Sequence, residues 1–155
     1  MKSIIVCASV SHGNTKKVAD AMSEVLDAPV LSPAQVRVED LESCDLVGFG
    51  SGIYYQRFHP QLLRLVRSLP ITRRGRAFIF ATSGFSEPPF RRYTRSLRRL
   101  LERKGFDVRD AYQCRGFDTS LPFKLVGGVR RGRPDEQDIA GAREFAANLR
   151  EHSSS

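Results

Sequence analysis

A strand-loop-helix segment near the N-terminus constrains this chain more than any other feature. The apolar run from Ile4 to Cys7 has the composition of a parallel strand that is covered on both faces. Apolar residues then recur at helical spacing, at Val18, Met22, Val25 and Leu26. We therefore predict a strand over 3–8 and a helix over 14–27, joined by a loop that is rich in hydroxyl groups and contains a glycine.

The loop and the start of the helix have the chemistry of an anion-binding site. The first backbone N–H groups of a helix have no intrahelical partner, and they lie at the positive end of the helix dipole. Gly13 lets the backbone approach an oxyanion that a Cβ would keep away. Further hydrogen bonds are available from the side chains of Ser9, Ser11, Asn14 and Thr15. This segment predicts a phosphate group bound at the start of the helix.

The sequence excludes three other phosphate chemistries. A Walker loop requires Gly, four residues and then Gly-Lys-Ser/Thr, and this string does not occur. A low-molecular-weight tyrosine phosphatase has an Arg-Ser/Thr pair six and seven residues after its cysteine, whereas Gly13 and Asn14 stand at those positions after Cys7. A receiver domain needs carboxylates after its first strand to hold Mg²⁺, and Ala8 and Ser9 supply none. The remaining interpretation is a site that holds a phosphate without transforming it.

The loop Ser9-Val10-Ser11-His12-Gly13-Asn14-Thr15 resembles the phosphate loop of the flavodoxin family, which runs Ser or Thr, a few variable residues, Gly, one residue and Thr. Residues 45–54 are similar to the second flavin loop of that family, and residues 78–84 to its third. The resemblance covers about residues 2–150 and is strongest to single-domain flavodoxin-like proteins; the phosphate loop is also similar to that of quinone-linked protoporphyrinogen oxidases. It implies that the chain binds flavin mononucleotide (FMN).

Alternating strand and helix patterns predict a parallel sheet with right-handed crossovers. We expect strands near 3–8, 45–50, 76–82 and 107–114, and a weak one near 29–32 at a sheet edge. Helices are expected over 14–27, 60–69, 91–104 and 136–150. With the resemblance, this predicts an α/β fold: a flavodoxin-like three-layer sandwich with a five-stranded parallel sheet of order 2-1-3-4-5. In flavodoxins, the standard example, the flavin lies at the carboxyl ends of the strands where the order reverses, and we expect the strands before the three loops to end together there.

The resemblance implies a role for each of the three loops. The first binds the phosphate, the second lies against the isoalloxazine ring with a tyrosine over one face, and the third bounds the pyrimidine side. No catalytic side chain and no metal ligand is expected, because the flavin performs the electron chemistry. The residues expected to bind FMN are Ser9, Ser11, His12, Gly13, Asn14, Thr15, Ser51, Gly52, Ile53, Tyr54, Tyr55, Thr82, Ser83, Gly84 and Phe85.

Several of these residue types also have simpler interpretations. The glycines of segment 48–52 are compatible with a tight turn alone, and no helix follows them at once as a dinucleotide-binding loop requires. His12 is compatible with a solvated loop position, and His59, which precedes Pro60, either ends a loop or contacts a ligand. Cys7 and Cys44 are expected to be small buried residues. Three cysteines without a Cys-x-x-Cys pair favour neither a disulfide framework nor a zinc site.

Length and hydropathy place the chain among ordinary globular proteins. Its 155 residues fit one domain, which we expect over 1–152, followed by a disordered tail over 153–155. No apolar run approaches the roughly 20 residues that are needed to cross a bilayer. The first residues show no signal-peptide pattern, so we expect a cytoplasmic protein.

A formal net charge of +8 distinguishes this chain from the flavodoxins, which tend to be acidic. The expected helix 91–104 carries one acidic residue, Glu102, against Arg91, Arg92, Arg95, Arg98, Arg99, Arg103 and Lys104. This helix is either a solvated surface or a docking patch for an acidic partner.

Two classes of function remain open. The first is an FMN-binding redox protein, either an electron carrier with a redox partner protein or an oxidoreductase with a quinone-like small molecule as acceptor. The second is an FMN-free module whose basic helix binds nucleic acid or an anionic surface, although nucleic acid is the less favoured ligand. The sequence leaves the electron donor, the acceptor and the enzymatic status undetermined.

Overall fold

The computed structural model describes residues 1–8, 14–54, 57–83, 88–115 and 136–153. Its sheet has a main path of five parallel strands in the order β2-β1-β3-β5-β6, and β4 pairs with β3 beside this path. The strands are β1 (Ser3–Ala8), β2 (Val30–Leu31), β3 (Leu46–Tyr54), β4 (Arg57–Phe58), β5 (Arg76–Ser83) and β6 (Asp107–Arg115). The predicted order of the parallel strands is confirmed, and the weak strand β2 lies at an edge.

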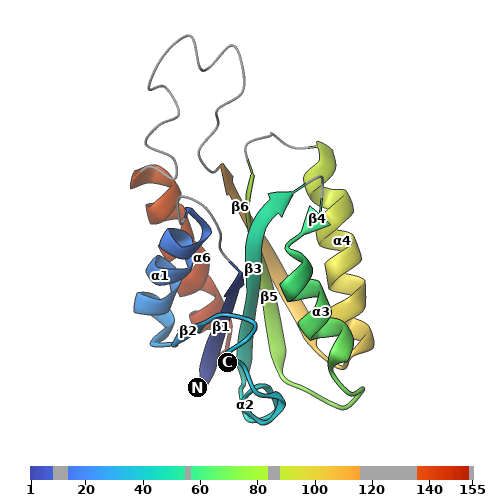
Figure 1. The fold of residues 1–155 in the computed structure, drawn as a ribbon. Helices are drawn as coiled ribbons and strands as arrows, with labels where there is room; N and C mark the ends of the chain where they lie inside the picture. Colours follow the sequence, from blue (N-terminus) through green and yellow to red (C-terminus); the bar gives the residue numbers. More distant parts are fainter. Residues whose placement is uncertain (9–13, 55–56, 84–87, 116–135, 154–155) are drawn as a thin grey trace.

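Helices cover both faces of the sheet and give the molecule three layers (Figure 1). On one face lie α1 (Asn14–Leu26) and α6 (Glu136–Ser153). On the other face lie α3 (Pro60–Ser68) and α4 (Pro88–Arg103). All four predicted helices are present, although α4 begins at Pro88 rather than residue 91 and α6 continues to Ser153. In the part of the chain that the structure describes, no helix is long and apolar enough to cross a membrane.

Two short elements were not predicted from the sequence. The two-residue strand β4 runs antiparallel to the end of β3, with Ile53 paired to Phe58. The five-residue helix α2 (Val38–Glu42) buries one side chain, Leu41, completely. Neither element is long enough to show a periodic apolar pattern, which is why both escaped detection. The sheet therefore has one antiparallel strand beyond the five parallel strands that were expected.

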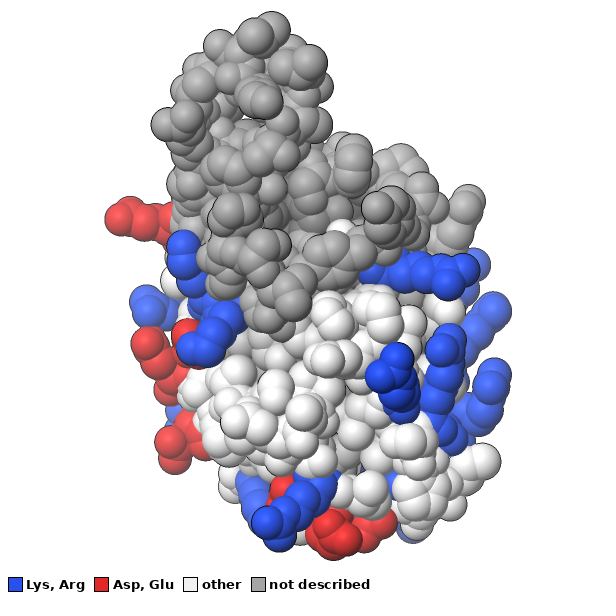
Figure 2. Space-filling view, in the orientation of Figure 1, with Lys and Arg blue, Asp and Glu red and all other residues white. Residues whose placement is uncertain are grey.

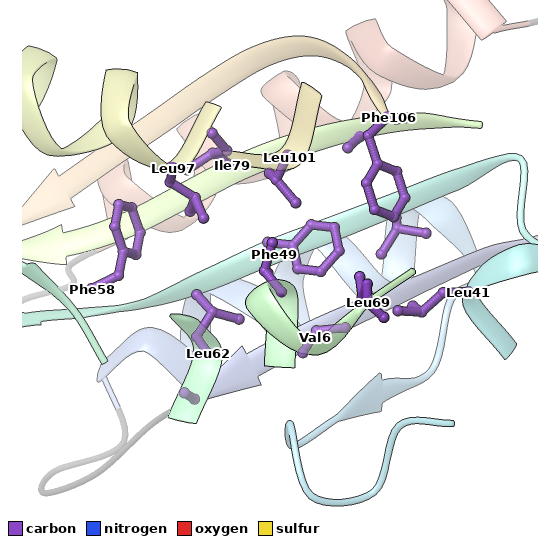
Figure 3. Packing of buried hydrophobic residues seen from close by; sticks show 14 of the residues in the cluster. Val6, Leu41, Phe49, Phe58, Leu62, Leu69, Ile79, Leu97, Leu101 and Phe106 are labelled. Atoms are coloured by element: carbon purple, nitrogen blue, oxygen red, sulfur yellow. The ribbon is translucent and has the colours of Figure 1, made fainter. Parts of the chain in front are cut away.

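Side chains of the central strands alternate between two cores. On the α3 and α4 side, Phe49 of β3 lies between Leu62 of α3 and Leu101 of α4 (Figure 3). On the α1 and α6 side, Phe78 and Phe80 of β5 pack among residues of both helices. Because both faces of these strands are buried, the strands form continuous apolar runs in the sequence.

The mixed apolar and polar pattern of β6 has a structural cause. Ala77 pairs with Val108 and Phe78 pairs with Asp110, so Arg109 is an extra residue in a bulge. The side chains of Asp107, Arg109 and Asp110 are exposed along this edge strand. Periodicity is lost at the bulge, and one side of the strand faces solvent.

Candidate functional site

The strands that precede the three predicted ligand loops end side by side. Ala8 of β1 is paired with Ser51 of β3, which is paired with Ala81 of β5; one step further, Gly52 is paired with Thr82. All three strands point toward the top of Figure 1, where α1 begins. The strand order reverses between β1 and β3, so these ends form the switch point of a doubly wound sheet. The predicted convergence of the three strand ends is confirmed.

A buried pair of hydroxyl groups joins α1 to the end of β5. The Oγ1 atoms of Thr15 and Thr82 lie 2.7 Å apart, within hydrogen-bond distance. The two residues are only 3% and 5% exposed. The side chains of β5 alternate, so that Phe78 and Phe80 face α1 and α6, and Thr82 continues that row. The structure thus brings together one residue from the first predicted loop region and one from the third.

The start of α1 has no negative charge to balance its dipole. Its first turn contains no acidic residue but does contain Lys16 and Lys17, whose side chains are exposed. Lys16 forms an ion pair with Asp20 at 3.5 Å, a solvent-exposed contact of little energetic weight. By contrast, α6 has Glu136 and Asp138 in its first turn. A helix N-terminus without acidic residues suits a bound anion.

The Ser51 hydroxyl fixes the path of the chain after β3. Ser51 is fully buried; its Oγ accepts a hydrogen bond from the His59 N–H at 3.0 Å and donates to the Gly52 carbonyl at 2.7 Å. The Nδ1 atom of His59 accepts from the Gln61 N–H at 3.0 Å and caps α3, with Pro60 in the first turn. His59, for which the sequence left a ligand role open, therefore has a structural role at this helix start.

Two glycines of β3 are required by packing. A Cβ on Gly48 would lie 2.3 Å from the Phe78 ring, and a Cβ on Gly50 would lie 2.3 Å from the Phe80 ring. The space that a side chain would need at each glycine is thus filled by an aromatic ring of the neighbouring strand β5. This packing, rather than a tight turn or a dinucleotide-binding loop, accounts for the Gly-Phe-Gly spacing.

The two cysteines described with their side chains are buried, as predicted. Burial raises the pKa of the Cys7 thiol from 9.0 to about 12, with a smaller contribution from Asp20. Burial also raises the pKa of Cys44, whose Sγ lies 3.0 Å from the Asp40 carbonyl. Both shifts favour the protonated thiol, which disfavours a nucleophilic thiolate at Cys7.

The structure locates part of the predicted ligand-binding set. Thr15 and Thr82 are in contact, Asn14 begins α1, and Ser51, Gly52 and Ile53 lie near the end of β3. Tyr54 and Ser83 are the last residues of β3 and β5, but their side chains are not described. The remaining members lie outside the described residues: Ser9, Ser11, His12, Gly13, Tyr55, Gly84 and Phe85.

Sequence reasoning missed a buried arginine at the opposite end of the sheet. Arg74 donates from Nε to the Lys104 carbonyl at 3.1 Å and from a terminal nitrogen to the Pro70 carbonyl at 2.7 Å, and its guanidinium lies 5.5 Å from the Phe106 ring centre. It lines a surface depression of about 510 Å³ at the amino ends of β3, β5 and β6. The run Arg73-Arg74-Gly75-Arg76 gives no signal to single out the buried member.

Within the described ranges, no cluster of three or more His, Cys, Asp and Glu side chains forms a metal site.

The helix surfaces differ in charge. In Figure 2, Lys and Arg gather on the right-hand side of the molecule, where Figure 1 places α3 and α4. The exposed basic residues there are Arg64, Arg67, Arg95, Arg98, Arg99 and Arg103.

Comparison with known proteins identifies the family. A family model described as a flavodoxin domain matches residues 4–109. An uncharacterized protein of Methanocaldococcus jannaschii is 36% identical over 151 residues, which cover 96% of this chain and 98% of that protein.

Solved structures have the same fold. A flavodoxin from the domain Archaea superposes with a TM-score of 0.72 at 18% identity, and the match covers 100% of both chains. The rubredoxin oxygen:oxidoreductase of Desulfovibrio gigas gives a TM-score of 0.72 at 15% identity, covering 99% of this chain and 37% of that one. At such identities the structures establish the fold alone, whereas the family model matches more than half of the sequence. This chain belongs to the flavodoxin family.

Proposed function

We propose that this chain is an FMN-binding redox protein that exchanges electrons with a partner protein or with a quinone-like acceptor. The single observation that carries the proposal is the buried Thr15 and Thr82 hydroxyl pair, which lies at the switch point beside the uncompensated N-terminus of α1. Membership of the flavodoxin family supports the choice of FMN.

The described residues fit the phosphate of FMN chemically. Hydroxyl and amide donors are present at the start of α1, and its first turn contains no carboxylate that would repel an anion. The ring would be held by Ser51, Gly52, Ile53, Tyr54 and Tyr55, and the phosphate by Ser9, Ser11, His12, Gly13, Asn14 and Thr15. Ser83, Gly84 and Phe85 would border the pyrimidine side, whereas Thr82 of the same predicted loop contacts Thr15. When bound, FMN supplies the electron-transfer chemistry, and the chain binds and orients it.

The proposed partner surface is the basic face of α3 and α4. A helix that follows a parallel strand begins at the carboxyl end of that strand, so α4 starts at the end of the sheet where β1, β3 and β5 end. Arg95, Arg98, Arg99 and Arg103 are exposed on α4, and Glu102 is its one acidic residue. Positive charge along α4 would steer an acidic redox protein toward this side of the sheet, where Arg95 is the named arginine nearest to the proposed flavin site.

Titration of the purified, flavin-free protein with FMN tests the cofactor. We expect the protein to turn yellow and to bind one FMN per chain, with a shifted flavin absorbance spectrum. A colourless protein that refuses FMN but binds duplex DNA in a salt-dependent manner would instead support the FMN-free module.

A charge-reversal experiment tests the partner surface. The FMN-loaded protein is reduced, and electron transfer to an acidic ferredoxin and to a water-soluble benzoquinone is followed by stopped flow. The double variant Arg95→Glu/Arg99→Glu should slow transfer to the ferredoxin about 10-fold at low salt and leave quinone reduction within about 2-fold.

The matched control is Arg37→Glu/Arg73→Glu, which changes net charge equally at exposed positions just before α2 and β5. Equal slowing in both double variants would show an effect of net charge and would contradict a localised docking surface. Steady turnover of NAD(P)H or quinone by the loaded protein alone would assign enzymatic activity.

A further inference from the structure

The Thr15 and Thr82 pair contains one more hydroxyl hydrogen than it uses. Two hydroxyl groups 2.7 Å apart share one hydrogen between their oxygens, so the acceptor's own hydrogen must point elsewhere. In the part of the chain that the structure describes, neither hydroxyl makes a second hydrogen bond. Both residues are at least nine-tenths buried, and a buried donor without an acceptor is costly. This spare hydrogen requires an acceptor.

The two directions of the hydrogen bond place the spare hydrogen differently. If Thr15 donates, the spare hydrogen lies on Thr82 at the end of β5. If Thr82 donates, it lies on Thr15, in the first turn of α1 beside backbone N–H groups that also lack intrahelical partners. An anion at this helix start accepts from the N–H groups and from Thr15 together, so it favours the second direction.

We propose that Thr82 is a positioning residue: it donates its hydroxyl hydrogen to Thr15 and thereby directs the Thr15 hydrogen toward the phosphate of the cofactor. This inference rests on the proposed FMN function. It also changes the role of Thr82, which the resemblance of its loop to that of flavodoxins placed at the pyrimidine side of the ring. In the new role, β5 supports the phosphate end of the site through α1.

The backbone of β5 and of α1 holds the two hydroxyl groups in contact. Thr82 is fixed in β5, between β3 and β6, by its pairing with Gly52 and Cys114. Thr15 is fixed by α1, which packs on the same face of the sheet through Val18 and Met22. Because both side chains are β-branched, their rotamer freedom is small, and the hydroxyl groups lose little further entropy when they pair.

Affinities for FMN and for riboflavin, which lacks the phosphate, separate this role from contact with the ring. Flavin fluorescence titrations would compare the wild type with Thr82→Val, Thr82→Ala and Thr82→Ser. We expect both hydroxyl-free variants to bind FMN about 10-fold more weakly and riboflavin within 2-fold of wild type. Thr82→Ser keeps the hydroxyl group and should retain FMN affinity within about 3-fold.

A double-mutant cycle with Thr15→Val tests whether Thr82 acts through Thr15. If it does, the loss of FMN affinity in Thr15→Val/Thr82→Val will equal the loss in Thr15→Val alone. Equal weakening of FMN and riboflavin in Thr82→Val, or additive losses in the cycle, would overturn the positioning role. A wild-type protein that binds neither flavin would refute the FMN proposal itself, so the two failures are distinguishable.

Discussion

The two sides of the sheet differ in charge. The helices α1 and α6 together carry six acidic and four basic residues, whereas α3 and α4 carry eight arginines and a single glutamate. On the first side, Arg143 forms an ion pair with Glu24 at 2.9 Å, and Arg150 donates to the Val25 carbonyl at 3.2 Å. These contacts join α1 to α6.

The arginines of α4 whose side chains the structure describes form no comparable contact between helices. Arg95, Arg99 and Arg103 are exposed and form no ion pair with any described residue, and Arg98 makes one long contact, 3.5 Å, to the Val108 carbonyl. Like charges gathered on one face repel and do not stabilise the fold. The difference agrees with the proposed docking surface on α3 and α4, whereas charged side chains on the other side join α1 to α6.

The two sides also differ in packing. On the α1 and α6 side, aromatic rings of β5 occupy the space above Gly48 and Gly50. On the other side, Phe49 packs edge-to-face with Phe106 at 5.3 Å between ring centres, and the adjacent Ser51 makes polar contacts to the start of α3. Stability is therefore sensitive to added side-chain volume on the α1 and α6 side. On the α3 and α4 side it is sensitive to the loss of the Ser51 hydrogen bonds.

The largest expected effect is on the α1 and α6 side. Gly50→Ala places a methyl group into the Phe80 ring and should lower the free energy of unfolding by about 2–3 kcal/mol, measured by urea denaturation. Adding Phe80→Leu should recover part of this loss. Adding Phe78→Leu, which lies against Gly48 instead, should recover none. Equal recovery by both would show that the clash is not local.

On the opposite side, Ser51→Ala should lower the free energy of unfolding by about 1–2 kcal/mol. The substitution leaves the His59 N–H without its 3.0 Å acceptor at the start of α3. Ser51→Thr keeps the hydroxyl group and is the comparison variant. If Ser51→Thr lowers stability and Ser51→Ala does not, the effect comes from crowding rather than from the hydrogen bond.

Cys7 should make stability pH-dependent on the α1 side. Its folded pKa of about 12 exceeds the ordinary 9.0, so above pH 9 the folded state binds more protons than the unfolded state and stability falls as pH rises. Between pH 9 and 10 the wild type should lose about 1 kcal/mol more than Cys7→Ala. Identical pH slopes in urea denaturation of the two proteins would contradict the burial effect.

The smallest effects concern surface charge and stability. Arg95→Glu/Arg99→Glu should change the free energy of unfolding by less than about 0.5 kcal/mol, because no ion pair with a described residue is lost. Arg143→Glu breaks the exposed pair with Glu24 and should cost up to about 1 kcal/mol. Greater destabilisation by the α4 double variant would mean that its arginines support the fold.

Sequence patterns predicted the five parallel strands and the four long helices because the features that specify them are local or periodic in the sequence. Fully buried strands such as Ser3–Ala8 form apolar runs, and α3 is preceded by a capping residue and begins with Pro60. The elements that were missed, the two-residue β4 and the five-residue α2, are too short for an apolar pattern to repeat. The strand β4 depends on its pairing with the end of β3, and α2 buries Leu41 in the core on the α3 and α4 side.

The sequence identified candidate residues for the site but not the contacts between them. The strand ends converge as expected, because parallel strands of known order end at one edge of the sheet. The contact between Thr15 and Thr82 joins residues 67 positions apart in the chain, and no local pattern encodes it. The interpretation of the glycines also depended on tertiary structure, since only the Phe78 and Phe80 rings explain them.

The central claim is that the hydroxyl groups and the helix start at the end of the sheet bind the phosphate of a flavin. Isothermal titration calorimetry of the flavin-free protein with FMN and with riboflavin measures this directly. The account predicts one FMN site per chain and an affinity at least about 100-fold higher than for riboflavin, because several charge-assisted hydrogen bonds form with the phosphate. Equal affinities for the two flavins, or no heat of binding with FMN, would contradict it.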